Sequence, residues 1–285
     1  MKKALSLMTA AALVLSLAAC GSTASSAASS EAASPEAASS DAASSEAASS
    51  EAASETETAE LSTVEPGKLI MSTNAAFPPY EMTTDSGEFE GIDIETAQAI
   101  ADKLGLELQI DDMDFDAALL SVQQGKADIV MAGVTVTDER KAVMDFSDSY
   151  ATGIQSIIVP EGSDIATPDD LAGKKIGTQR GTTGYIYCSD DFGDDAVVAY
   201  DNGLTAVQAL NNGQVDAVVI DNAPAKEFIA ANPGLVILET SYAEEDYAIG
   251  LAKGSSLEDA INGALEELKA DGTLQSIVDK YISAE

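Results

Sequence analysis

Short apolar segments alternate with segments of helical spacing along residues 66–285, and this alternation constrains the fold more than any other feature of the chain. Apolar residues recur at helical spacing from Ile94 to Leu104, and Gly105 ends the pattern. Another helix is expected over residues 115–122, and others begin at Thr182, Gly203 and Asn222. Strands are expected at residues 70–72, 106–110, 127–132, 175–178, 196–200, 215–220 and 235–238. The pattern predicts an α/β fold with parallel sheets covered by helices on both faces, divided into two domains of about 110 residues each.

Polar and aromatic side chains follow the expected strands where a ligand would bind. In such sheets ligands bind beyond the carboxyl ends of strands, where loops lead into helix N-termini. These loops hold both arginines of the chain, together with aromatic, hydroxyl and acidic residues: Asn74, Phe77, Tyr80, Gly133, Thr135, Arg140, Gln179, Arg180, Gly181, Thr182, Thr183 and Asp221. Random surface loops would not be expected to sort in this way, so the pattern predicts one shared ligand site.

The segment from Met131 to Arg140 reads M-A-G-V-T-V-T-D-E-R and ends with one of only two arginines among 285 residues. A guanidinium group meets a carboxylate through two parallel hydrogen bonds, and the Gly133 backbone and Thr135 hydroxyl can approach the same small ligand closely. This reading favours an amino-acid carboxylate as the partner of Arg140. The alternative is a helix start, with Thr137 as the N-cap and Arg140 in a surface ion pair worth about 0–1 kcal/mol.

An amino-acid zwitterion also needs an ammonium site. Asp221 is the candidate, with Gly133 and Thr135 close to the same group; the alternative role of Asp221 is to cap the helix that follows it. The helix-start amides near Thr182 and Thr183 would join Arg140 in receiving the carboxylate.

Phe77 and Phe115 are candidates for two apolar walls around the ligand side chain, with a cation–π contribution of about 0.5–2 kcal/mol for a cationic ligand. The alternative is that both are core residues.

Composition excludes several classes of function. The chain has 49 acidic and 14 basic residues, so nucleic acid and anionic lipid surfaces, which need basic patches, are not expected partners. There is no histidine, which excludes Ser-His-Asp catalysis and most zinc sites. No cofactor or metal is expected, although a calcium loop at residues 190–195 is an open alternative. The adjacent acids Asp111 with Asp112 and Glu244 with Glu245 are expected to be solvated.

The first 20 residues have the layout of a secretory signal. Lys2 and Lys3 precede an apolar run over residues 4–17, which is shorter than the roughly 20 residues that a bilayer crossing needs. Small residues then lead to Cys20, and this arrangement resembles the bacterial lipoprotein signal, which implies that Cys20 is the lipidated first residue of the mature protein. Cys188 would then be the one remaining thiol, expected as a small apolar helix residue.

Residues 21–65 form a tether in this interpretation. A five-residue repeat of the kind S-S-E-A-A dominates this segment, which lacks aromatic residues and β-branched runs. Such a composition cannot offset chain entropy by burial, so the segment is expected to be disordered.

Several motifs together resemble the type-3 extracellular solute-binding proteins of ABC amino-acid importers, over residues 68–284. They are F-P-P-Y at 77–80, G-I-D-I at 91–94, M-D-F-D-A at 113–117, G-K-A-D at 125–128, the segment ending at Arg140, G-T-T at 181–183, V-D-A-V-V-I-D ending at Asp221, and A-D-G-T at 270–273. The resemblance implies a periplasmic-binding-protein-like type II fold, in which two α/β lobes are joined by two crossing strands near residues 151–156 and 245–250. Lobe 1 would comprise residues 66–153 and 249–285 and lobe 2 residues 154–248, with the ligand cleft between them.

The resemblance also implies roles for single residues. The carboxylate-binding arginine of the family falls on Arg140, the ammonium-binding aspartate on Asp221, and the aromatic walls on Phe77 and Phe115. Residues of the side-chain pocket would be Asn74, Phe77, Tyr80, Phe115 and Gln179, with Gly184 at another selecting position. Asn74 stands where binders of cationic amino acids often carry an acid, which favours polar neutral ligands, whereas the acidic excess elsewhere favours a cation.

The function implied is that of an exported, monomeric receptor, held by lipid on the outer face of the bacterial cytoplasmic membrane, which closes on a free L-amino acid and delivers it to the permease subunits of an ABC importer. The alternatives are an enzyme on the same fold, either a dehydratase or a cell-wall lyase, and an amino-acid-sensing lipoprotein.

Overall fold

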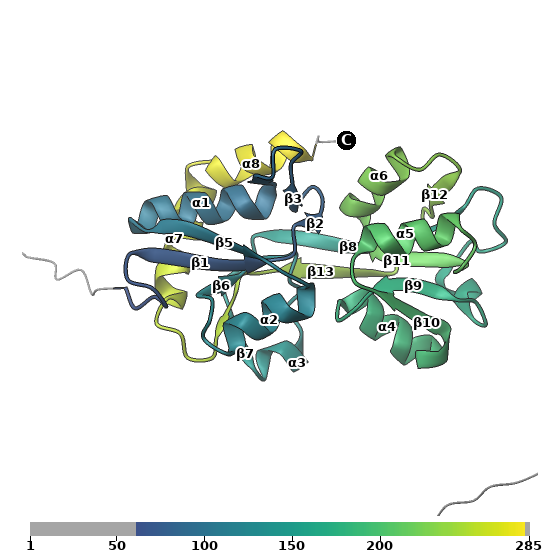
Figure 1. Cartoon of the computed structure of the whole chain (residues 1–285), viewed down its shortest axis with the longest axis horizontal. Coiled ribbons are helices and arrows are strands. Elements are labelled where there is room, and N and C mark those ends of the chain that lie inside the picture. The colour runs from purple at the N-terminus through teal and green to yellow at the C-terminus, as the bar shows by residue number, and fades with distance from the viewer. Residues whose placement is uncertain (1–60, 283–285) are drawn as a thin grey trace, which may run out of the picture. The chain divides into compact units, whose positions relative to one another are not determined.

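Two sheets form the framework of the structure, a computed structural model that describes residues 61–282 (Figure 1). The first sheet has the strand order β5-β1-β6-β14-β7. Its strands are β1 (Lys68–Thr73), β5 (Glu107–Asp112), β6 (Ile129–Val130), β7 (Met144–Phe146) and β14 (Gly250–Ala252). β1 pairs in parallel with β5 and β6, whereas β14 runs antiparallel to both of its neighbours.

The second sheet has the strand order β10-β9-β11-β8-β12, and β13 also pairs with β8. Its strands are β8 (Ala151–Pro160), β9 (Ile176–Gln179), β10 (Val197–Tyr200), β11 (Ala217–Asp221), β12 (Leu235–Ile237) and β13 (Ala243–Tyr247). β9 is parallel to β10 and β11, and β8 is antiparallel to all of its neighbours. A third, small antiparallel sheet consists of β2 (Ala76–Phe77), β3 (Glu81–Thr83) and β4 (Phe89–Glu90).

Helices cover both faces of each large sheet (Figure 1). The helices of the first sheet are α1 (Ile92–Leu104), α2 (Phe115–Gln123), α3 (Asp138–Lys141), α7 (Glu258–Ala270) and α8 (Thr273–Tyr281). Those of the second sheet are α4 (Thr183–Phe192), α5 (Gly203–Asn211) and α6 (Asn222–Ala230), with 3₁₀ turns η1 (Pro168–Leu171) and η2 (Asp194–Ala196). No helix within residues 61–282 is long and apolar enough to cross a membrane.

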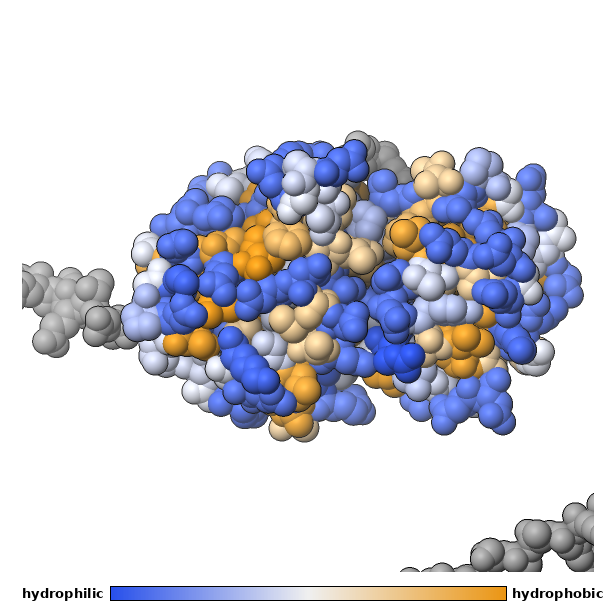
Figure 2. Space-filling view, in the orientation of Figure 1, coloured by the Kyte–Doolittle hydropathy of each residue, from blue (hydrophilic) through white to orange (hydrophobic). Residues whose placement is uncertain are grey.

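Each large sheet therefore has an apolar core on both faces. On the first sheet, one core is shared with α1, α7 and α8 and includes Leu69 and Ile100, and the other lies under α2 and includes Ile70 and Val122. Leu69 and Ile70 are neighbours in β1 and point to opposite faces, as strand geometry requires. Such a strand is buried on both sides and reads as a continuous apolar run, which is what made the strands visible in the sequence. Figure 2 shows that the surface over these layers is largely hydrophilic on the face in view.

The α/β class, the expected strands and the expected helices are confirmed, with boundaries that differ by at most two residues. The sheets are mixed rather than purely parallel, because β14 runs antiparallel to its neighbours in the first sheet and β8 to its neighbours in the second. β8 and β13 pair from Ala151 with Tyr247 to Gln155 with Ala243. The strands of the first sheet come from residues 68–146 and 250–252, and those of the second from residues 151–247. This chain order is consistent with the expected lobes, whose exact boundaries stay a prediction.

The predicted signal peptide, Cys20 and most of the predicted tether lie outside the described residues. Residues 61–65, the last five of the predicted tether, were expected to be disordered, but they contact the folded part. Leu61 packs against the core shared by α1, α7 and α8, and the Val64 amide donates to Asp128 Oδ1 at 2.7 Å. The same carboxylate accepts from the Ile70 amide at 2.7 Å, so Asp128 fastens this segment to β1.

Candidate ligand-binding site

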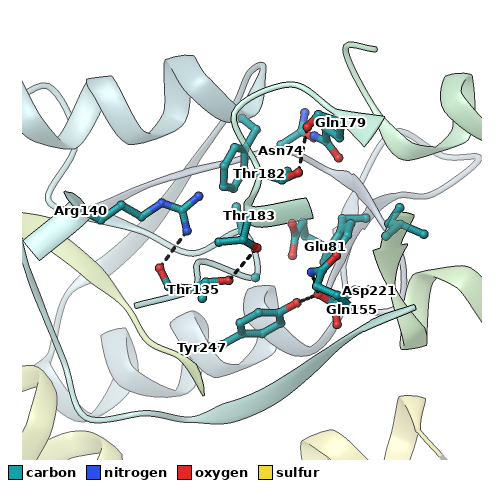
Figure 3. Close-up of a pocket in the computed structure, with 15 residues that line it drawn as sticks. Asn74, Glu81, Thr135, Arg140, Gln155, Gln179, Thr182, Thr183, Asp221 and Tyr247 are labelled. Atoms are coloured by element: carbon teal, nitrogen blue, oxygen red, sulfur yellow. Dashed lines mark hydrogen bonds between the residues drawn. The ribbon is translucent and has the colours of Figure 1, made fainter. Parts of the chain in front are cut away.

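A pocket lies where the carboxyl ends of strands from both large sheets meet (Figure 3). The space enclosed by its side chains is about 430 Å³, including the part that is open to solvent. The residues that line it are Asn74, Phe77, Glu81, Phe115, Ala132, Gly133, Thr135, Arg140, Gln155, Gln179, Thr182, Thr183, Ile220, Asp221 and Tyr247. The expected convergence of the strand-end loops is therefore observed, and most of the residues singled out in the sequence line this one pocket.

The Arg140 segment forms the expected helix start, but Arg140 itself is not on the surface. Thr137 caps α3, accepting a hydrogen bond from the Arg140 amide at 3.2 Å. The Arg140 side chain is nevertheless only 8% exposed, so it is not a surface ion pair. Its guanidinium donates to Thr135 O at 2.8 Å and, across the cleft, to Gly181 O at 3.2 Å. It lies 5.4 Å from the ring centre of Phe115, so one aromatic wall also orients the cation.

Asp221 ends β11 and points into the pocket instead of capping α6. It occupies the N-cap position, but no cap hydrogen bond from its side chain forms. The carboxylate accepts from the Ile154 amide at 3.1 Å, from Gln155 Nε2 at 2.8 Å and from the Tyr247 hydroxyl. Burial raises the pKa of Asp221 to about 7. A buried carboxylate with these donors and without a cation is well suited to receive an ammonium group.

The other end of the pocket is closed by a hydrogen bond between the two sheets. Gln179 Nε2, at the end of β9, donates to Asn74 Oδ1 at 2.9 Å. The orientation of the Asn74 amide is fixed because its Nδ2 donates to Met113 O at 2.9 Å. The Asn74 side-chain oxygen, a hydrogen-bond acceptor, is therefore held in place at this end.

Thr182 and Thr183 lie at the start of α4, as expected. The Thr182 hydroxyl caps the helix by accepting from the Tyr185 amide at 3.4 Å. Thr183 Oγ1 lies 3.4 Å from Thr135 Oγ1, so the hydroxyls of the two loops meet across the pocket (Figure 3). The first amides of α4 therefore face the same space as Arg140 and can receive an anion.

The expectation that Tyr80 belongs to the side-chain pocket is wrong. Tyr80 does not line the pocket but is 3% exposed in the core behind it. Its ring stacks on Phe77 at 5.7 Å between centres and meets Tyr247 edge-on at 5.3 Å. The short strand β3 alternates its side chains, so that the following residue, Glu81, takes the place in the pocket wall.

The expectation that Glu244 and Glu245 are both solvated is wrong for Glu245. Side chains alternate along β13, so Glu244 is exposed while Glu245 is 6% exposed. Glu245 Oε2 accepts from Thr135 Oγ1 and from Gln155 Nε2, both at 3.0 Å, and its other oxygen has no hydrogen-bond partner. The signal that was available in the sequence is the period-2 pattern that puts Glu245 on the same face as Tyr247.

Glu81 and Asp93 are buried acids that the sequence analysis did not select. Both are fully buried, and Glu81 lines the pocket. Asp93 Oδ2 accepts from the Gly133 amide at 3.0 Å and from the Tyr150 hydroxyl at 2.8 Å. Burial raises the pKa of Asp93 to about 6 and that of Glu81 well above its usual value. In the sequence, Asp93 belongs to the G-I-D-I motif at 91–94, to which no single-residue role was given.

Two further expectations concern residues outside the pocket. Cys188 is buried in α4, and burial raises its pKa to about 12, so it is a packing residue rather than a reactive thiol. Arg180 is exposed and lines a separate cavity with Asp114, Asp116 and Asp201. Within the described residues, the acids at 190–195 belong to no cluster of three or more side chains suited to a metal ion.

The geometry defines a two-lobed solute-binding protein with its site between the lobes. Residues 69–284 match the family described as bacterial extracellular solute-binding proteins, family 3, and the chain belongs to this family. It is therefore a solute receptor, and the comparisons give no support to an enzyme on the same fold.

Relatives of the chain are named for the amino acids that they bind. The L-cystine-binding protein TcyJ of Escherichia coli K12 is 33% identical over 226 residues, covering 78% of this chain and 85% of the relative. The structure of an ancestral arginine-binding protein bound to glutamine is 42% identical with a TM-score of 0.73, covering 76% of this chain and 99% of that chain. The same ancestral protein bound to arginine gives 42% identity and a TM-score of 0.72.

Proposed function

We propose that this protein binds a free L-amino acid between its two lobes and passes it to the permease of an ABC importer. The observation that carries the proposal is the placement of Arg140 and Asp221 in one pocket. Arg140 lies in α3 beside the first sheet and Asp221 ends β11 of the second, and both are almost fully buried. Opposite charges held apart in this way match the carboxylate and ammonium groups of a zwitterion.

In this proposal Arg140, the Thr135 hydroxyl and the start of α4 at Thr182 and Thr183 receive the ligand carboxylate. Asp221 receives the ammonium group, together with the carbonyl of Gly133 and the hydroxyl of Thr135. The ligand then touches both lobes, so that its binding energy favours the closed arrangement.

The ligand side chain would lie between Phe77 and Phe115 and extend toward Asn74 and Gln179. The fixed acceptor oxygen of Asn74 favours a side chain that ends in N–H donors. The pocket wall and its surroundings also hold more acid than base, since Glu81, Asp221 and Glu245 outnumber Arg140. We therefore propose a polar side chain of the arginine or glutamine kind, with the cationic one bound more tightly. The names of the relatives, which include cystine, arginine and glutamine binders, are consistent with this class.

The receptor would work outside the cell as a monomer, attached to the cytoplasmic membrane by lipid on Cys20 and by the tether. This part of the proposal is supported by the signal layout of residues 1–20 and by the extracellular family to which the chain belongs. Lobe 1 would consist of residues 66–153 and 249–285, and lobe 2 of residues 154–248.

A ligand screen tests the proposal. The thermal unfolding of the full chain in detergent is followed with each of the twenty amino acids, cystine, ornithine and citrulline. A ligand at 100 times its Kd stabilises the folded state by about 2.7 kcal/mol, which raises the melting temperature by several degrees. Stabilisation by arginine or glutamine is the expected result, and stabilisation by none of these compounds would refute the proposal.

A further inference from the structure

Two acids behind the ligand site lack a cation that would allow both to be ionised. Glu81 and Asp93 are 0% exposed, and neither oxygen of Glu81 meets a hydrogen-bond donor among the described residues. With no cation beside them and no donor for Glu81, two fully buried carboxyl groups are too costly to ionise together, so one of them carries a proton.

The surroundings decide which of the two acids holds the proton. Asp93 Oδ2 is the acceptor for the Gly133 amide and the Tyr150 hydroxyl, and these donors favour its ionised form. Glu81 has no comparable donors, so the proton belongs on Glu81. The titratable and charged groups around the pair and the adjoining pocket are Tyr80, Asp112, Tyr150, Arg140, Asp221, Glu245 and Tyr247. Arg140 is the one base in this set, and its nearest contacts are Thr135 O, Gly181 O and the Phe115 ring.

Glu81 also lines the ligand pocket, so the proton lies next to the bound solute. We infer that Glu81 and Asp93 form a proton-exchange site: a cationic ligand side chain displaces the Glu81 proton to solvent, whereas a neutral side chain of the same shape leaves it in place. The inference rests on the proposed function, and it adds that selection between cationic and neutral amino acids depends on pH. One proton leaves the protein and one positive charge enters the pocket, so the charge of the pocket is conserved.

The consequence for affinity has a definite sign. Arginine binding is opposed by protons and therefore strengthens as pH rises, by at most tenfold per pH unit relative to a neutral analogue when one proton is exchanged. Once Glu81 is ionised in the free protein, the dependence ends. Asp221 also exchanges a proton with solvent, but it faces the ammonium group that all amino acids share. Its contribution cancels when two amino acids of the same shape are compared.

Isothermal titration of the full chain with arginine and with citrulline provides the test. Citrulline replaces the guanidinium by a neutral group of nearly the same shape. Titrations at one pH in buffers of different ionisation enthalpy give the number of protons released with each ligand. Arginine is expected to release up to one proton more than citrulline, and Glu81→Gln is expected to abolish the difference while it keeps the shape of the side chain.

A second variant keeps the test decisive if Glu81→Gln does not fold. Asp93→Asn removes the neighbouring charge, so the excess proton release with arginine should shrink. Equal release with both ligands in the unmodified protein would overturn the inference, as would an excess that persists in both variants. If neither arginine nor citrulline binds, the proposed ligand class itself fails, and this result is distinct from binding with equal proton release.

Discussion

Replacement of Arg140 by alanine should weaken amino-acid binding strongly while leaving the fold intact. Two of the five N–H donors of the side chain are used by Thr135 O and Gly181 O, which leaves donors for the ligand carboxylate. Hydrogen bonds to charged groups contribute about 1.5–3 kcal/mol each, and the loss of one partner of a buried charge pair costs about 2–5 kcal/mol. A loss of about 2–4 kcal/mol is expected, which corresponds to a Kd roughly 30 to 1,000 times higher.

The chain supplies its own control for this experiment, because Arg180 is the only other arginine and lines a different cavity. Arg180→Ala should leave the Kd within about threefold of the unmodified value, a change of about 0.7 kcal/mol at most. Titration calorimetry with the ligand found in the screen gives both values, and the melting temperatures without ligand report on folding. An Arg140→Ala protein that is folded and binds as tightly as the Arg180→Ala protein would refute the carboxylate role.

Other substitutions test the remaining parts of the proposal. Asp221→Asn should weaken binding by at least tenfold in calorimetry. It should also remove the fall in stability of the ligand-free protein between about pH 4 and 7, since burial raises the pKa of this carboxyl from 3.8 to about 7 and the folded state loses stability over this range as pH rises. Normal affinity in that variant would argue against the ammonium site. Gly181→Ala should weaken binding more than Gly162→Ala, because both glycines have positive φ but only the added Cβ at Gly181 would collide with Asp116, at 1.6 Å. Equal affinities of the two variants would show that the close approach of Gly181 to Asp116 is not needed for closure of the lobes. Cys20→Ser should move the protein from the membrane fraction to the soluble fraction, and unchanged fractionation would contradict lipid anchoring.

The sequence predicted the framework well because the framework depends on local patterns. β1 and β11 are continuous apolar runs, and α1 ends at Gly105, whose φ of 69° suits glycine. The convergence of Arg140, Thr135 and Asp221 was also predictable, since it follows from the rule that loops at the carboxyl ends of strands share one edge. The family match extends over the same residues.

What the sequence did not predict depends on the direction of single side chains. Glu81 begins β3 and Tyr80 directly precedes it, so a shift of one residue decides which of them reaches the pocket. Glu245 was missed for the same reason in β13. The hydrogen bonds of Asp93 could not be predicted from local patterns, because its partners Gly133 and Tyr150 lie 40 and 57 residues away along the chain.

The strands that pass between the lobes also supply walls of the pocket. Gln155 belongs to β8 and Tyr247 to β13, and both donate to Asp221. The same two strands are paired to each other, and the ring of Tyr247 lies so close to Gly153 that an added Cβ would be 2.5 Å from it. A bend in these strands would therefore move the donors that hold Asp221. We therefore expect that opening of the lobes shifts these donors, so that release of the solute coincides with a weakening of the proposed ammonium site.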